Sequence, residues 1–136
     1  MAVYSGFGID LPFKAASDMN SYQYRFVKAD TVLGAPYVNL ATGASNPVPL
    51  GVLMNDPYAE GEATVRVAGI AKVLIGGSAA VSVGQFVKCG SAGWGELIHA
   101  TSGSGYSGIA LEDITASGGY ISVLLRPWVS KVTGTT

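Results

Sequence analysis

The sequence predicts an all-β domain, a small β-barrel or β-sandwich with little helix. Short runs of β-branched and aromatic residues recur roughly every 8 to 15 residues, and glycine, serine, aspartate and proline separate them. No window longer than about ten residues keeps the 3.6-residue apolar period of an amphipathic helix. One or two helical turns near residues 13–19 are the most that we expect. At 136 residues, the chain has the length of one domain.

The expected strands are recognised by alternation of apolar and polar residues. Residues 63–75 alternate most clearly, with Val65 and Val67 on one face of the strand. Residues 18–29 place aromatic side chains at alternate positions, so this segment is expected to form a half-buried strand as well. Further strands are expected at residues 49–54, 84–89, 95–100, 107–112 and 120–128.

The two ends of the chain differ from the middle. Residues 1–13 are expected to form an N-terminal arm that lies on another surface, because free tails are poor in aromatic residues. The alternative is an ordinary first strand. Residues 14–130 then form the β-barrel or sandwich domain, and residues 131–136 form a short flexible tail. The large apolar side chains of the arm are Tyr4, Phe7, Ile9, Leu11 and Phe13.

Residues 33–49 are uncharged and contain three prolines. Proline cannot donate a hydrogen bond to a neighbouring strand, so we expect a surface loop or a sheet edge here.

Two segments of the chain follow one template. Residues 50–67 and 107–125 each contain a glycine-led apolar strand, an aspartate turn, a loop with glycine and an alternating strand. "YRFVK" precedes the first segment and "GQFVK" precedes the second. Either an internal duplication or the small number of turns available to hairpins explains this pattern. The aligned pairs are Gly51 with Gly108, Asp56 with Asp113, Gly61 with Gly118, and Val65 with Ile121.

The charge of the chain limits its partners. Eight basic and nine acidic side chains make up 12% of the residues and leave a net charge of −1. The scattered basic residues provide no phosphate-binding face, which argues against nucleic acid. The N-terminus lacks the features of a signal peptide, and no apolar run approaches the roughly 18 residues of a membrane span. So few charges favour a protein whose surface is largely covered by partners.

No catalytic, cofactor or metal site is expected. His99 is the sole histidine and has no partner ligands at zinc spacing, and no nucleophile elbow is present. Asp56 and Asp113 fall at matching turns, where aspartate caps backbone amides more often than it performs acid–base chemistry. The single cysteine, Cys89, excludes an internal disulfide. The aromatic residues expected to contact another subunit or the core are Trp94, Tyr106 and Trp128.

Three blocks of sequence occur in a characteristic order after "FKAASDM" and "YRFVK". They are "PLGVLMNDPYAEGEATVRVAGIAKVLIGG", "VSVGQFVKCGSAG" and "GIALEDITASGGYISVLL". In this order the blocks resemble a family of small capsid decoration (cement) proteins of tailed phages, which are found beside major capsid genes. The resemblance spans residues 13–127, and each block consists mainly of glycine, valine and turn residues.

The resemblance implies a non-enzymatic β-rich protein, β-tulip-like in fold, that binds the outside of the expanded phage head. Its implied partners are the major capsid protein and itself, as a homotrimer, with no nucleic acid and no membrane. The implied location is the outer capsid surface of the virion, after assembly in the host cytoplasm. The alternative is a small carbohydrate- or ligand-binding module, in which Trp94, Tyr106 and Asp113 would line a pocket.

Overall fold

The computed structural model describes residues 8–30, 36–42, 49–77, 80–97 and 106–129, with the backbone alone for Tyr106 and residues 127–129. The described residues form nine strands and no helix, so the expected all-β fold is confirmed. They contain no helix that is long and apolar enough to cross a membrane. The strands are β1 (Gly8–Ala15), β2 (Phe26–Asp30), β3 (Tyr37–Leu40), β4 (Pro49–Leu53), β5 (Glu62–Leu74), β6 (Phe86–Cys89), β7 (Gly95–Leu97), β8 (Tyr106–Ala110) and β9 (Tyr120–Val129).

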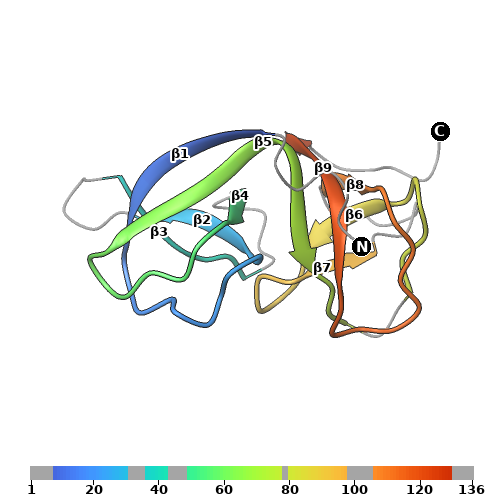
Figure 1. Ribbon diagram of the computed structural model, residues 1–136, viewed down its shortest axis with the longest axis horizontal. Helices are drawn as coiled ribbons and strands as arrows, with labels where there is room; N and C mark the ends of the chain where they lie inside the picture. The colour runs from blue at the N-terminus through green and yellow to red at the C-terminus, as the bar shows by residue number, and fades with distance from the viewer. Residues whose placement is uncertain (1–7, 31–35, 43–48, 78–79, 98–105, 130–136) are drawn as a thin grey trace.

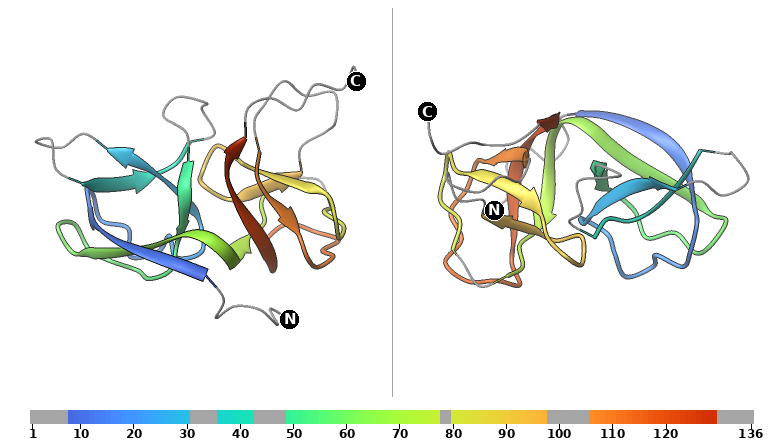
Figure 2. Two further views of the ribbon diagram at one scale, coloured as in Figure 1. Left: turned by 90° about the horizontal axis from the view of Figure 1, so that it is seen from above. Right: turned by 180° about the vertical axis from the view of Figure 1, so that it is seen from behind.

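The strands form two lobes that lie side by side (Figures 1 and 2). In lobe 1 the strand order is β1-β3-β2-β4-β5, and β5 pairs again with β1, which closes a five-stranded barrel. In lobe 2 the order is β5-β9-β8-β6-β7, and a parallel bridge from Ile75 to Gly95 links the two ends of the row. Each lobe therefore surrounds its own core, and most strand edges are paired.

The long strand β5 belongs to both lobes. Its first half pairs with β1 and β4, and its second half pairs with β9. The change occurs at Gly69, which pairs with Gly8 of β1 and also with Leu125 of β9. Gly69 has a φ of 98°, a conformation that glycine adopts without steric cost. The bend of β5 in Figure 1 separates the two lobes.

The two lobes repeat one topology. In both, the first strand pairs antiparallel with the fifth and parallel with the third, and the second pairs with the third and the fourth. Thus β1 to β5 of lobe 1 correspond to β5 to β9 of lobe 2, with β5 counted in both. The similarity of the two hairpins thus extends to a repeat of the whole five-strand topology.

The hydrogen bonds of the two hairpins match as well. The Met54 N–H donates to the Thr64 carbonyl oxygen, and the Leu111 N–H donates to that of Ser122. The register of β4 against β5 and of β8 against β9 places Val65 opposite Leu53 and Val123 opposite Ala110. Val65 therefore corresponds to Val123, two residues beyond the alignment expected from sequence. The β8–β9 connection is one residue longer than the β4–β5 connection, and it pairs with Val81 and Ile75 of its own lobe.

The two cores follow from this arrangement. In lobe 1, Met19, Val27, Leu53 and Val65 are fully buried with other small apolar residues. In lobe 2 the cluster of buried side chains also includes Phe26, Ala41 and Val52 of lobe 1, so the lobes share an apolar contact. Burial of each large side chain stabilises the fold by roughly 1.5–3 kcal/mol.

Three local expectations were wrong. The segment 18–29 is a strand only from Phe26 onward, because Tyr24 has a φ of 69° and cannot continue an extended chain. Residues 37–40, expected in a surface loop or at a sheet edge, form β3, which is paired on both sides, with β2 and with the end of β1. The residues described between Phe13 and Met19 contain no helical turn.

The expected arm also differs. Residues 8–13 are part of β1 and pair with β5 from Gly8 to Lys14. This pairing closes the lobe 1 barrel, so the alternative of an ordinary first strand holds for these residues. Residues 1–7 and the expected tail at 131–136 lie outside the described residues.

Candidate contact surface

The first strand carries the most exposed apolar ridge of lobe 1. Ile9 is 60% exposed and Leu11 is 43% exposed, although both lie in a paired strand. Next along the same face, Phe13 is partly buried and packs against the lobe 1 core. We call Ile9, Leu11 and Phe13 the β1 ridge. Two large exposed side chains on one strand face are typical of a surface that is covered by a partner.

One edge of strand β1, which carries the β1 ridge, is only partly paired. Within the described strands, β1 pairs with β3 only at Lys14 and Ala15, whereas its other edge pairs with β5 along its length. Pro12 lies beside the unpaired stretch and has no N–H to offer to an incoming strand. Proline at an edge blocks indiscriminate strand addition, so contacts here are expected to use side chains.

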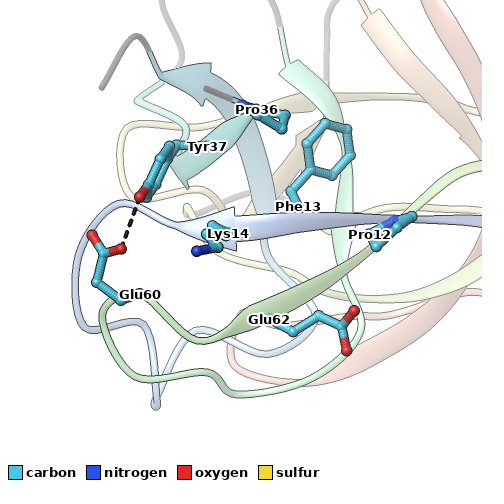
Figure 3. Close-up of a pocket in the computed structure, with 7 residues that line it drawn as sticks. All are labelled: Pro12, Phe13, Lys14, Pro36, Tyr37, Glu60 and Glu62. Atoms are coloured by element: carbon cyan, nitrogen blue, oxygen red, sulfur yellow. Dashed lines mark hydrogen bonds between the residues drawn. The ribbon is translucent and has the colours of Figure 1, made fainter. Parts of the chain in front are cut away.

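A pocket of about 470 Å³ opens beside the β1 ridge (Figure 3). Its apolar wall brings Phe13 of β1 close to Pro36 at the start of β3. Lys14 lies between this wall and the acidic loop before β5, so the pocket is apolar on one side and polar on the other. The residues that line it are Pro12, Phe13, Lys14, Pro36, Tyr37, Glu60 and Glu62.

A hydrogen bond fixes the polar side of the pocket. The Tyr37 hydroxyl donates to Glu60 Oε1 at 2.8 Å. This hydrogen bond to a carboxylate raises the pKa of Tyr37 above its ordinary value, since loss of the phenolic proton would leave two negative charges in contact. Glu60 has a φ of 67°, so its backbone is held in an uncommon conformation that directs the loop toward Tyr37.

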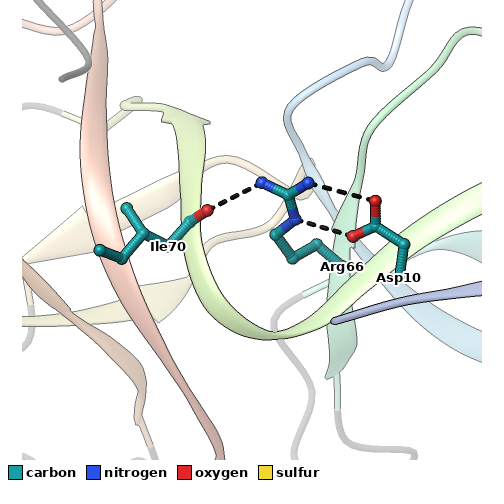
Figure 4. A network of polar contacts seen from close by, with 3 residues as sticks. All are labelled: Asp10, Arg66 and Ile70. Carbon is teal, nitrogen blue, oxygen red and sulfur yellow. Dashed lines mark hydrogen bonds and ion pairs between the residues drawn. The ribbon is translucent and has the colours of Figure 1, made fainter. Parts of the chain in front are cut away.

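An ion pair secures the start of β1 at the junction of the lobes (Figure 4). Arg66 Nε and Nη2 donate to the Asp10 carboxylate at 2.7 and 3.1 Å, and Arg66 Nη1 donates to the Ile70 carbonyl oxygen at 3.0 Å. The arginine hydrogen bonds hold the pKa of Asp10 below its ordinary value. The aliphatic part of Arg66 lies against Gly8, where a Cβ atom would be 2.5 Å from Arg66 Cδ.

Lobe 2 has a groove at the corresponding position. It has a volume of about 400 Å³ and includes Trp94, which corresponds to Tyr37 in the register of β3 against β2 and of β7 against β6. Trp94 Nε1 donates to Glu96 Oε2, and Tyr37 donates to Glu60 Oε1. Glu96 corresponds to Asn39 rather than to Glu60, so the aromatic side chains match but the glutamates that hold them come from different positions.

The structure separates the expected contact residues into groups. It brings Ile9, Leu11 and Phe13 together in the β1 ridge, whereas Trp94 lies in lobe 2. Tyr106 and Trp128 lie in β8 and β9, and their side chains are not among those described. Tyr4 and Phe7 lie outside the described residues.

Sequence reasoning missed Tyr37 and Glu60. Tyr37 stands within the proline-rich segment 33–49, where the sequence predicts a surface loop or a sheet edge, and Glu60 stands in a turn 23 residues away. The alternation of "YVNL" was the available signal for a strand at Tyr37. Nothing local indicates that the two side chains meet.

The Asp113 carboxylate accepts a hydrogen bond from a backbone amide, but this is the Val83 N–H, 30 residues away, at 2.8 Å, and not an amide of its own turn. In the other hairpin Asn55 has the capping role, because its Oδ1 accepts from the Thr64 N–H at 3.0 Å. Asp113 is not among the residues that line the Trp94 groove, so the two do not share the pocket expected for a ligand-binding module. Cys89 is buried, and His99 lies outside the described residues. The described part of the chain contains no group of three metal-binding side chains.

Comparison with known proteins extends these observations to the whole fold. No protein-family model and no curated protein matches the chain. The fold is similar to that of the N base of head fiber gp8.5 in bacteriophage phi29, with a TM-score of 0.64. The match covers 87% of this chain and 93% of that chain at 15% sequence identity. The similarity therefore includes both lobes and establishes a shared fold.

Proposed function

We propose that the chain is a structural, non-enzymatic virion protein that binds the outer surface of an expanded phage capsid. There it stabilises the head by bridging neighbouring major capsid subunits, as a homotrimer that is assembled in the host cytoplasm. The observation that carries this proposal is the similarity in fold, over 87% of the chain, to the base of a phage head fiber. The resemblance of the three sequence blocks to phage decoration proteins supports it independently.

The β1 ridge and the adjacent pocket are the proposed capsid contact. Ile9 and Leu11 supply apolar area, and the pocket accepts an apolar side chain that enters between Phe13 and Pro36. Glu60 and Lys14 at its polar side provide an acceptor and a donor for orientation. Tyr4 and Phe7, which precede β1, are proposed to extend this contact, and Trp94, Tyr106 and Trp128 to serve contacts of lobe 2.

Bridging requires no strong single contact. A trimer that presents three equal surfaces to a lattice binds with a high effective concentration once the first contact has formed. A shallow apolar ridge with one pocket is therefore sufficient. The shared strand β5 joins the two lobes of each subunit, so it connects contacts made by different lobes.

The test is co-sedimentation of the purified protein with expanded and with unexpanded heads that lack it. We expect saturable binding to expanded heads at a fixed copy number per capsid subunit. The double variant Ile9→Glu with Leu11→Glu should lose at least tenfold in affinity, because two carboxylates would be buried against an apolar partner. Val83→Glu is the matched control, since Val83 is also exposed but lies in lobe 2, outside the ridge.

Absence of wild-type binding to both kinds of head would overturn the proposal. Equal losses for the double variant and for Val83→Glu would leave the capsid role intact but would exclude the β1 ridge as the contact. Circular dichroism of each variant verifies that the barrels remain folded.

A further inference from the structure

The outer faces of the two lobes can be compared position by position because the lobes repeat one topology. In lobe 1, Phe26 of β2 pairs with Val52 of β4, which pairs with Arg66 of β5. Phe26 and Val52 are fully buried and Arg66 is only 7% exposed. We call these three residues the lobe 1 row.

Lobe 2 covers the lobe 1 row within the same chain. Phe26 and Val52 belong to the apolar cluster that also contains the core of lobe 2. The Phe26 N–H donates to the Gly93 carbonyl oxygen in the turn between β6 and β7, at 2.7 Å. At this face, one lobe therefore serves as the partner of the other.

The corresponding row of lobe 2 consists of apolar residues only. Phe86 of β6 pairs with Ile109 of β8, which pairs with Leu124 of β9, and Leu124 pairs with Ile70 of β5. Leu124 is 38% exposed and the other three are partly exposed. In this lobe 2 row, Leu124 stands where lobe 1 has Arg66. Arg66 is covered by β1, through Asp10 and Gly8, whereas no described segment of the chain covers Leu124 in this way.

The charges around the lobe 2 row indicate what could cover it. Side chains two positions apart on a strand share a face, so three basic residues that lie two positions from members of the row border it. One of them, Lys88, is paired with Glu96 of β7. Residues 69–136 contain four basic and three acidic side chains, a net charge of +1, whereas residues 1–68 contain four basic and six acidic, a net charge of −2. The basic side chains beside the row are Lys72, Lys88 and Arg126.

We propose that the lobe 2 row is the interface at which a second copy of this chain docks, with its acidic lobe 1. Within a subunit, lobe 2 packs on the lobe 1 row; between subunits, lobe 1 of the next copy would pack on the lobe 2 row in the same way. The two surfaces in contact differ, so the interface is heterologous, and three copies joined in this way form the ring of the proposed homotrimer. An apolar row bordered by basic side chains and an acidic partner lobe are complementary in both packing and charge. This interface belongs to the homotrimer proposed above and specifies the surface that forms it.

The test is sedimentation equilibrium of the full chain at about 100 µM without phage heads. We expect a mass three times that of the 13.9-kDa chain. Leu124→Glu should shift the protein to monomer, because a carboxylate would be buried against the partner's acidic lobe. Arg126→Glu should weaken association at least tenfold at low salt, and Val83→Glu, also in lobe 2 but outside the row, should leave the mass unchanged.

A monomeric wild type at this concentration would overturn the inference, as would a Leu124→Glu variant that keeps the wild-type mass. Circular dichroism checks that each variant is folded, and Leu124→Ser replaces Leu124→Glu if the latter unfolds. Failure of this interface is distinguishable from failure of the capsid role. Co-sedimentation with heads measures the capsid role on the β1 ridge, whereas the mass in free solution depends on the lobe 2 row.

Discussion

Tyr24 and Gly84 occupy the same position in the two lobes, and both have a positive φ, 69° and 88°. Each N–H donates across the barrel to the fourth strand of its lobe, Tyr24 to the Leu53 carbonyl oxygen and Gly84 to that of Ala110. The position thus requires a left-handed backbone, which costs a tyrosine about 1–2 kcal/mol. The Tyr24 ring compensates through an edge-on contact with Tyr120, at 5.6 Å between ring centroids.

Replacement of Gly84 by alanine should lower the free energy of unfolding by about 1 kcal/mol. No atom lies within 4 Å of the added Cβ, so the backbone conformation is the sole cause. Urea denaturation measures the effect. Gly108→Ala provides the contrast, because its Cβ would collide with Val123 Cγ1 and lie 2.9 Å from the Leu124 carbonyl oxygen, and about 3 kcal/mol is expected. Equal effects of the two substitutions would contradict this explanation.

The Asp10–Arg66 ion pair should make stability depend on pH. Because the arginine hydrogen bonds hold the pKa of Asp10 below the ordinary 3.8, the pair stabilises the fold above pH 3.8 and this contribution is lost as pH falls through the lowered pKa. Asp10→Asn should cost about 1 kcal/mol at pH 7. Urea denaturation of both proteins at a series of pH values should show the difference shrinking below about pH 4. A difference that stays constant down to pH 2 would contradict the assignment.

Tyr37→Phe tests the polar side of the pocket. The pKa of Tyr37 is raised by its hydrogen bond to Glu60, so its contribution to stability is complete below pH 10 and is lost as pH rises through the raised value. An ultraviolet titration of the wild type should therefore contain one tyrosine that ionises late. The substitution should remove this late component. An unchanged titration curve at high pH would show that Tyr37 is not the residue concerned.

The shared strand β5 should make the two lobes unfold together. The lobes share β5, and Phe26, Ala41 and Val52 of lobe 1 belong to the apolar cluster of lobe 2, so opening of one lobe exposes apolar surface of the other. Trp94 and Trp128 both lie in lobe 2, so tryptophan fluorescence reports on lobe 2 and far-ultraviolet circular dichroism reports on both lobes. The two signals should give the same urea midpoint. Two separated transitions would show that the lobes are independent.

Local patterns in the sequence were sufficient for most of the strands. The alternation from Ala63 onward marks β5, and β4, β6, β7, β8 and β9 coincide with expected strands. The expected segment at residues 18–29 was too long, because alternation cannot reveal the positive φ of Tyr24. The sequence predicts the apolar residues of the β1 ridge, but it does not predict that they belong to a strand that closes a barrel.

The sequence by itself determined an all-β chain, the positions of most strands and the existence of two similar hairpins. These follow from side-chain periodicity and turn residues, which act over a few positions. Only the tertiary structure decided that β5 serves two barrels, that β1 closes the first barrel, and that Val65 corresponds to Val123. Strand pairing joins residues far apart in the chain and depends on barrel closure, which no local pattern encodes. The same closure brings Tyr37 to Glu60 and leaves Leu124 of the lobe 2 row 38% exposed.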